Sequence, residues 1–345
     1  MHNAGKALSD RTARPASGRA GRRGDMSETT AATRPPEPDF SAITTAELLA
    51  YRDAENRFRS SGAARAILGE PDPGAAIDWR KIALPGRDLP VRVYRSTRAG
   101  DGGAAARDGL PLVLHVHGGG FVGTAAQCDW ANSHLAARLP AVVVSVEHRL
   151  LAPDSPLADA ADDGWDALAQ VLRHAPRWGV DPARTAVFGE SCGALITALT
   201  ALRARDTGLG LAAQILVNPA VEVTGTMFDH ASVTEYAYRP TRALPQLRLF
   251  QRLAVPPGAD ARAVSPLYAD DLSGLAPALV VVPTQDAVAD HGRRYAERLR
   301  AAGTPTRLST YPGARHAFLT LPGVEPQAEA ARAEICQFLR AALAS

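Results

Sequence analysis

Short apolar runs alternate with amphipathic stretches along most of the chain. The runs lie at residues 110–116, 141–146, 185–188, 213–217 and 278–282. Runs of this kind, which end in glycine or polar residues, are typical of strands buried on both faces. The stretches between them carry apolar residues at helical spacing and lie at 126–138, 157–174, 192–205 and 290–302. The alternation predicts an α/β fold with a mostly parallel central sheet and helices on both faces.

The two ends of the chain add further elements. Before the first buried run, the pattern predicts a helix at 41–68 and strands at 77–84 and 89–95. The second of these strands alternates apolar and polar residues, which is typical of a strand with one face in water. A strand near 307–311 and a helix near 326–343 close the chain.

Residues 222–262 interrupt the alternation, because they contain no clear strand and only one helical stretch, near 243–254. An insertion between two sheet strands lies over the carboxyl ends of the strands, where open α/β sheets bind their ligands. We therefore expect residues 222–262 and 41–75 to form a helical cap. Residues 1–38 are expected to be a flexible leader, and residues 39–345 to be one domain.

Composition narrows the classes of protein. The 345 residues are 46% hydrophobic and 21% charged, which excludes a largely disordered chain. No apolar run approaches the roughly 18 residues needed to span a bilayer. The three cysteines are widely spaced, without a CxxC or Cys/His motif, so we expect neither a disulfide framework nor a metal site. A cytoplasmic protein without a cofactor is the simplest expectation.

The net charge is small, with 38 basic and 36 acidic side chains. The basic surplus lies in the first 25 residues, which include five of the arginines and one of the two lysines. The remainder is close to neutral, so no basic face for nucleic acid is expected.

The first candidate for chemistry is Gly189-Glu190-Ser191-Cys192-Gly193, between a predicted strand and a predicted helix. G-x-S-x-G in this setting is a nucleophile elbow, a turn too tight for a Cβ that exposes the serine hydroxyl. The second candidate is His117-Gly118-Gly119-Gly120-Phe121, at the end of the run 110–116. Its glycines let backbone N–H groups turn into a cavity, where they can stabilise an oxyanion.

A serine nucleophile needs a base and an acid that orients the base. Asp286 follows the strand at 278–282, and His316 follows the strand near 307–311, so both lie at the carboxyl edge of the sheet. His291 is a rival base that we expect to be exposed on a helix, and Asp290 is a rival acid that we expect to cap that helix.

Further motifs carry a family resemblance over residues 80–345. They are Glu147-His-Arg-Leu-Leu-Ala-Pro-Asp, Ser265-Pro-Leu, Asp286-Ala-Val-Ala-Asp and His316-Ala-Phe, together with the elbow and the glycine loop. In this order they resemble the hormone-sensitive-lipase-like (HGGG) branch of the α/β-hydrolases, which are esterases and lipases.

The resemblance implies roles for single residues. Ser191 would be the nucleophile, His316 the general base and Asp286 its orienting acid. The N–H groups of Gly119, Gly120 and Cys192 would form the oxyanion hole. The substrate would be a small-molecule ester, and homodimers are common in this branch.

The chain departs from the family at the elbow and after the strand at 141–146. Glu190 stands where the family usually has Asp, and Cys192 is unusual, although we expect its side chain to be a small buried filler. The family usually has an aromatic residue before Arg-Leu-Ala-Pro, and this chain has Glu147 and His148 there. Each of the two is expected either to pair with a neighbour or to contact an unusual substrate.

Aromatic and other large side chains are candidates for the substrate pocket. They are Phe121, Trp130, His134, Met227, Phe228, Tyr236, Tyr238 and Phe250. His115 is expected to be a hydrogen-bonded core histidine, while His230 and Cys128 have no evident partner in the sequence.

The leading hypothesis is a serine esterase. The alternative is a lyase or cyclase on the same fold, for example one that eliminates acetate from a natural-product intermediate; the unusual residues at 147–148 and 192–194 motivate it. A third hypothesis, a binding protein of this fold, fits poorly, because such proteins lose the triad histidine and this chain has His316.

Overall fold

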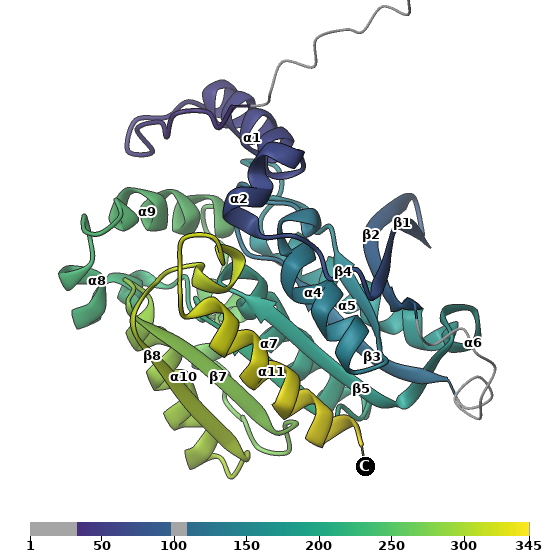
Figure 1. Ribbon diagram of the computed structural model, residues 1–345. Coiled ribbons are helices and arrows are strands. Elements are labelled where there is room, and N and C mark those ends of the chain that lie inside the picture. The colour runs from purple at the N-terminus through teal and green to yellow at the C-terminus, as the bar shows by residue number, and fades with distance from the viewer. Residues whose placement is uncertain (1–32, 98–108, 345) are drawn as a thin grey trace, which may run out of the picture. The chain divides into compact units, whose positions relative to one another are not determined.

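The computed structural model describes residues 33–97 and 109–344, and the helices and strands lie there. Figure 1 shows a central sheet with helices on both faces. The strands are Ala75–Leu84 (β1), Arg87–Ser96 (β2), Leu110–Val116 (β3), Val142–Val146 (β4), Val180–Glu190 (β5), Ala213–Val217 (β6), Ala278–Gln285 (β7) and Thr306–Arg315 (β8). The α-helices are Thr45–Arg59 (α1), Arg65–Leu68 (α2), Asp129–Arg138 (α4), Leu157–Arg173 (α5), Ala175–Trp178 (α6), Cys192–Asp206 (α7), Ala231–Glu235 (α8), Ala243–Ala254 (α9), Ala289–Ala301 (α10) and Ala328–Leu343 (α11).

The eight strands form one sheet in the order β1-β2-β4-β3-β5-β6-β7-β8. The hairpin β1–β2 is antiparallel and joins β4 in antiparallel register. All the pairings from β4 to β8 are parallel. The predicted α/β class with a mostly parallel sheet is confirmed, and the observed bounds of β3, β6 and α9 equal the predicted ones.

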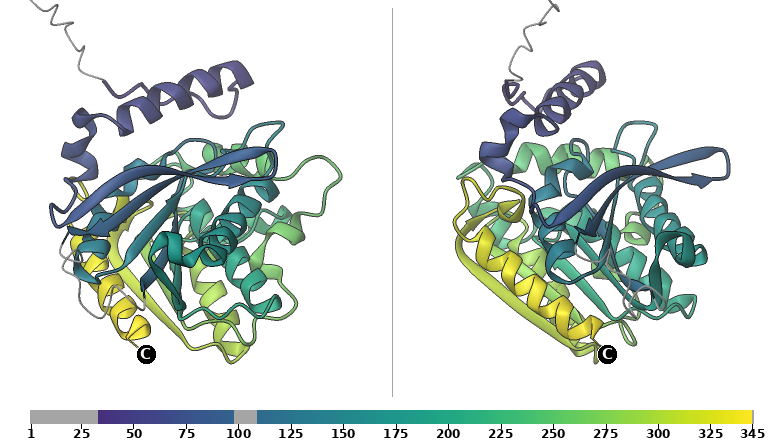
Figure 2. Two further views of the ribbon diagram at one scale, coloured as in Figure 1. Left: turned by 90° about the vertical axis from the view of Figure 1, so that its right-hand side faces the viewer. Right: turned by 45° about the vertical axis from the view of Figure 1, so that its right-hand side comes forward.

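Two apolar layers cover the sheet, because neighbouring residues of each buried strand point to opposite faces. Leu112 and Leu114 of β3 pack in the layer beneath α5, α7 and α10. Val113 packs in the opposite layer, beneath α4 and α11. Figures 1 and 2 show α4 and α11 together on one side of the sheet.

A third apolar cluster lies at the carboxyl edge of the parallel strands. It joins Leu48 of α1 and Phe250 of α9 to Phe121, which follows β3. Thr44 caps α1 in a capping box with Glu47, which fixes where this helix begins. Both segments expected to form a cap therefore contribute helices to this edge.

The predicted leader, residues 1–38, lies mostly outside the described residues. Its described part, 33–38, makes specific contacts: Arg34 forms an ion pair with Glu55 of α1 at 3.1 Å, and Glu37 accepts a hydrogen bond from Gln246 of α9 at 2.7 Å. These last residues of the predicted leader thus join the two cap segments.

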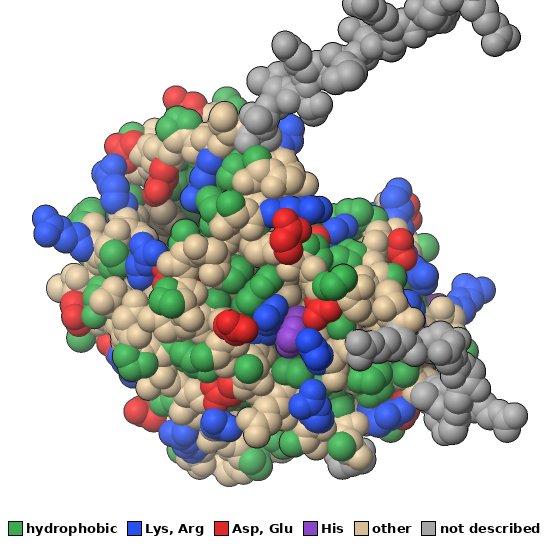
Figure 3. Space-filling model, viewed as in Figure 1, with side chains coloured by type: hydrophobic (Ala, Val, Ile, Leu, Met, Phe, Trp, Pro, Cys, Tyr) green, Lys and Arg blue, Asp and Glu red, His purple; other side chains and the backbone are tan. Residues whose placement is uncertain are grey.

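Charges are interspersed on the face shown in Figure 3, where basic and acidic side chains alternate over short distances. In the described part of the chain, no helix is long and apolar enough to cross a membrane.

Candidate active site

Ser191 stands at the turn between β5 and α7. Its backbone has φ 53° and ψ −117°, a conformation that non-glycine residues rarely adopt. Its N–H donates to the carbonyl of Val217 at 2.9 Å, which anchors the turn to β6. A strained, anchored serine at a helix N-terminus is the geometry of a nucleophile elbow.

The two glycines of this turn have no room for a side chain. A Cβ on Gly189 would lie 2.3 Å from the carbonyl oxygen of Gly193. A Cβ on Gly193 would lie 2.2 Å from the carbonyl oxygen of Val116 on β3. The glycines therefore let α7 approach the neighbouring strands closely enough to form the turn.

Three side chains form a continuous hydrogen-bonded chain at this edge of the sheet. The Oγ of Ser191 lies 2.8 Å from Nε2 of His316, and Nδ1 of His316 lies 2.8 Å from Oδ2 of Asp286. The other carboxylate oxygen of Asp286 accepts from the N–H of Val288 at 3.0 Å, which fixes the carboxylate. The spacing allows a proton to pass from the hydroxyl to the imidazole, as general-base catalysis requires.

Opposing effects act on the pKa of His316. Burial lowers the pKa, but the charge and hydrogen bond of Asp286, and the charge of Glu190, outweigh burial and raise the pKa above its ordinary value of 6.5. The imidazole is therefore a stronger base than a free histidine.

The glycine loop after β3 lines the same cavity as Ser191. Gly119 has φ +92°, and a Cβ there would lie 1.8 Å from the carbonyl oxygen of Val122. Among the described residues, no hydrogen bond uses the N–H of Gly119, Gly120 or Cys192 as its donor. Three free donors beside a serine hydroxyl can bind an oxyanion.

Ser191 and His316 open into a cavity of about 510 Å³. The glycine loop, β7 and the turn after β8 form its base, and α1, α2 and α9 form its upper wall. Its apolar lining includes Phe58, Leu68, Phe121, Leu247 and Phe250.

Comparisons with known proteins identify the family of this chain. A family model described as the α/β hydrolase fold matches residues 113–320. The chain belongs to the α/β hydrolase fold family. This α/β hydrolase is 36% identical to carboxylesterase NlhH of Mycobacterium tuberculosis over 284 residues, which cover 79% of the chain and 84% of that protein. It is 32% identical to an arylesterase of Saccharolobus solfataricus over 268 residues, 74% of the chain and 81% of that protein.

Solved structures give the same result. An ester hydrolase from the metagenome of Lake Arreo superposes with a TM-score of 0.77 at 29% identity, covering 90% of the α/β hydrolase and 94% of that chain. An esterase of the archaeon Pyrobaculum calidifontis superposes with a TM-score of 0.73 at 30% identity, covering 85% of the α/β hydrolase and 93% of that chain. The predicted resemblance to esterases and lipases is confirmed, and the α/β hydrolase is an enzyme of the carboxylesterase type.

Residues of α1 that the sequence analysis did not single out hold the glycine loop of the α/β hydrolase. Arg52 donates to the carbonyl of Phe121 at 2.8 Å and also to that of Leu151. Asn56 accepts from the N–H of Gly123 at 2.9 Å. Arg59 donates to the side-chain oxygen of Gln127, and the side-chain nitrogen of Gln127 donates to the carbonyl of Gly118 in the loop. Their spacing of four and three residues puts them on one helix face, which is the signal that could have revealed them.

Glu147 and His148 do not line the cavity, so the structure replaces their predicted substrate contacts with structural ones. Glu147 accepts hydrogen bonds from the N–H of Ala125 at 2.7 Å and the hydroxyl of Thr124 at 3.1 Å. His148 is buried and stacks on His117 with 4.2 Å between ring centroids. Both side chains thus support the polypeptide around the glycine loop.

The candidate pocket residues divide into several groups. Phe121, Tyr236 and Phe250 line the cavity. Trp130 and His134 line a separate hollow near Arg332, whose guanidinium lies 3.6 Å from the Trp130 ring centroid. The remaining three lie elsewhere: Met227 is fully buried, Phe228 packs on the core, and Tyr238 is exposed.

The predictions for the rival acid and base need correction. His291 was expected to be exposed but is fully buried, and its Nε2 lies 3.1 Å from the carbonyl of Met227. Asp290 does not cap its own helix; it accepts from the N–H of Ser232 on α8 at 2.9 Å. His230, expected to have no evident partner, lies 2.6 Å from Glu222. The segment after β6 packs on the start of α10 and covers His291 and Asp290. The residue pattern of α10 by itself does not show that another segment covers this part of the helix.

Cys192 behaves as the expected filler. Its side chain is buried in the apolar cluster at the carboxyl edge, and burial raises the pKa of its thiol to about 12. The thiol therefore stays protonated and unreactive near neutral pH.

Proposed function

We propose that this α/β hydrolase cleaves carboxylic esters through an acyl-enzyme on Ser191. The observation that carries the proposal is the unbroken contact from Ser191 through His316 to Asp286, at 2.8 Å and 2.8 Å. The names of its relatives, a carboxylesterase and an arylesterase among them, support the same reaction class.

The contacts support a two-step mechanism. Nε2 of His316 takes the proton of the Ser191 hydroxyl while Oγ attacks the ester carbonyl, and the C=O electron pair moves onto oxygen. Collapse of this tetrahedral intermediate breaks the ester C–O bond, and His316 gives its proton to the leaving alkoxide. Water then attacks the acyl-enzyme with His316 again as base, which releases the acid and restores Ser191.

The negative oxygen of each intermediate needs hydrogen-bond donors. The N–H groups of Gly119, Gly120 and Cys192 carry no other hydrogen bond among the described residues, so they are free for this role. Such preorganised donors act mainly on the transition state, because the carbonyl oxygen gains its charge only there.

The size of the cavity favours a small to medium ester as the substrate. About 510 Å³ lies within the range of small-molecule sites. Charged side chains such as Arg59 and Arg315 line the cavity as well, but its apolar residues favour an alkyl or aryl group beside the reacting carbonyl. We propose residues 39–345 as one catalytic domain with a cap contributed by 41–75 and 222–262. The cytoplasmic location and the homodimer stay predictions.

Hydrolysis of p-nitrophenyl acetate, butyrate and octanoate tests the proposal. We expect turnover of the two shorter esters and a lower kcat/KM for octanoate, because the cavity volume is limited. A folded protein that hydrolyses none of the three, and that no fluorophosphonate probe labels, would contradict the proposed function.

The lyase or cyclase hypothesis receives no support from a specific contact. It was motivated by the residues at 147–148 and 192–194, but Glu147, His148 and Cys192 all have structural surroundings. Labelled water separates the two reactions, since hydrolysis places its oxygen in the released acid and elimination does not.

The pH profile should report the raised pKa of His316. The base must be neutral to accept the serine proton, so kcat/KM should fall as pH drops through a midpoint above 6.5. The same raised pKa affects folding, because the folded state favours the charged form of His316. His316 therefore adds to the free energy of unfolding below pH 6.5, and this contribution is lost as the pH rises through the pKa of His316 in the folded state. The measurement is kcat/KM against pH for p-nitrophenyl acetate; a midpoint below 6.5 would contradict the assignment.

Arg52 should act on catalysis through the loop that it holds. Replacing it by glutamine removes the donor to Phe121, so we expect kcat to fall about tenfold, roughly 1.4 kcal/mol, with little change in KM. Arg57→Gln is the matched control, because Arg57 lies on the exposed face of the same helix. An equal effect of both variants, or a change in KM alone, would contradict the positioning role.

A further inference from the structure

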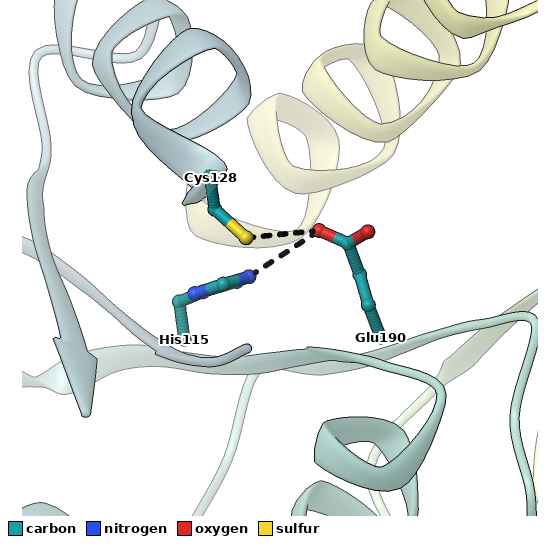
Figure 4. Close-up of side chains that lie close together, drawn as sticks. All are labelled: His115, Cys128 and Glu190. Carbon is teal, nitrogen blue, oxygen red and sulfur yellow. Dashed lines mark hydrogen bonds and ion pairs between the residues drawn. The ribbon is translucent and has the colours of Figure 1, made fainter. Parts of the chain in front are cut away.

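Behind the nucleophile, three potential metal ligands converge from distant parts of the chain. They are His115 on β3, Cys128 just before α4, and Glu190 at the end of β5 (Figure 4). We propose that they bind one Zn²⁺ ion beside the triad, at a site that shares none of the three triad residues, although Glu190 directly precedes Ser191 and borders the cavity. The sequence pattern predicts no metal site, because the three residues share no short motif.

Two of the three ligand pairs lie at distances close to those of a tetrahedral zinc site, in which these three side chains would leave one position for water. Glu190 Oε1 lies 3.6 Å from Nε2 of His115 and 3.6 Å from Sγ of Cys128. Zinc bonds of about 2.0 Å to nitrogen or oxygen and 2.3 Å to sulfur place neighbouring tetrahedral ligands about 3.3–3.5 Å apart. Small side-chain movements therefore suffice to bring the three ligands onto one ion.

The imidazole of His115 points an unpaired nitrogen into this cluster. His115 is fully buried, and its Nε2 has no hydrogen-bond partner. Its Nδ1 lies 2.8 Å from the hydroxyl of Ser145 and 3.1 Å from the side-chain nitrogen of Asn132. With the ring proton on Nδ1 and accepted by Ser145, the Nε2 lone pair is free for a metal. An outer hydrogen bond of this kind is typical of zinc-bound histidine.

The remaining ligands have suitable surroundings. The second carboxylate oxygen of Glu190 accepts from the hydroxyl of Thr320 at 2.6 Å, which leaves Oε1 for the ion. The thiol of Cys128 has only the long contact to Glu190 at 3.6 Å. All three ligand side chains are at least nine-tenths buried, so unpaired polar atoms here are costly.

Charge balance favours a divalent ion. One thiolate, one carboxylate and one neutral imidazole around Zn²⁺ sum to zero, which suits a buried position. Binding forms the Zn–S, Zn–N and Zn–O bonds and releases the thiol proton to water, so affinity should rise with pH.

The ion would join β3, the start of α4 and the end of β5 immediately before Ser191. Its expected effect is therefore on the stability of the strand end that carries the elbow, because the ion would link three separate segments of the chain.

A second buried cluster, Glu222, His230 and His291, lies under the cap. His230 and Glu222 are already hydrogen-bonded at 2.6 Å, which is shorter than the ligand spacing of a zinc site. This cluster contains no cysteine, so a thiolate signal distinguishes the two.

The test uses the full chain, expressed in zinc-supplemented medium and then, separately, with Co²⁺ replacing zinc. We expect about one zinc per chain by elemental analysis, and a thiolate-to-cobalt charge-transfer band in the near ultraviolet. Cys128→Ser should lose the band and most of the zinc. Cys336→Ser is the matched control, because Cys336 is also buried but lies on α11, and it should keep both.

The following results would contradict zinc binding at this site. Cobalt bound without a thiolate band would exclude Cys128 as a ligand. Zinc retained equally by Cys128→Ser would exclude the thiol as a ligand. If Cys128→Ser does not fold, the wild-type spectrum decides alone, since a wild-type protein that takes up no metal or gives no band contradicts the site. None of these results depends on esterase activity, so failure of the zinc site and failure of the proposed function are distinguishable.

Discussion

Ser191→Ala should lower kcat for p-nitrophenyl butyrate by about 10⁶-fold. The variant removes the oxygen that forms the acyl-enzyme and leaves His316 and Asp286 in place. Because triad members act as a unit, loss of the nucleophile removes nearly all of their contribution. The residual rate should come from the free N–H groups of the glycine loop acting on water attack.

The matched control is Ser155→Ala. The hydroxyl of Ser155 has no hydrogen-bond partner, and the residue does not line the cavity, so activity should stay near that of the wild type. Fluorophosphonate labelling should be lost in Ser191→Ala and kept in Ser155→Ala. Circular dichroism and a thermal melt show whether each variant folds. Activity of folded Ser191→Ala within tenfold of the wild type would refute Ser191 as the nucleophile.

Gly119→Ala should lower kcat/KM by about 10²–10³-fold, the usual cost of losing an oxyanion-hole donor. The added Cβ would lie 1.8 Å from the carbonyl oxygen of Val122, so the backbone must move. The movement displaces the N–H groups of Gly119 and Gly120 from the position of the developing oxyanion. Turnover of p-nitrophenyl acetate and butyrate measures the effect.

Gly303→Ala separates backbone strain from this displacement. Gly303 has φ +81°, close to the value at Gly119, but a Cβ there meets no atom within 4 Å. This control should lose about 1–2 kcal/mol of stability and little activity. Equal activity of the two variants, with Gly119→Ala folded, would refute the role of the loop in oxyanion binding.

The sequence alone determined the layers of the fold and the positions of the triad candidates. Strand and helix periods are local properties, so β3, β6 and α9 could be predicted with their observed bounds. The elbow and the glycine loop are also local, because a turn that leaves no room for a Cβ requires glycine at fixed offsets from Ser191. Asp286 and His316 could be predicted because parallel strands end at one edge of a sheet.

Tertiary structure alone decided which polar residues serve the site. Arg52 reaches a loop 69 residues further along the chain, and Glu147 binds the turn before α4 instead of a substrate. His291 is buried because a cap segment more than 50 residues earlier packs on it. His115, Cys128 and Glu190 meet only because β3 and β5 are adjacent in the sheet while α4 covers one face. A local pattern shows which face of a helix or strand is polar, but the partner of a polar side chain depends on which distant segments the fold brings beside it.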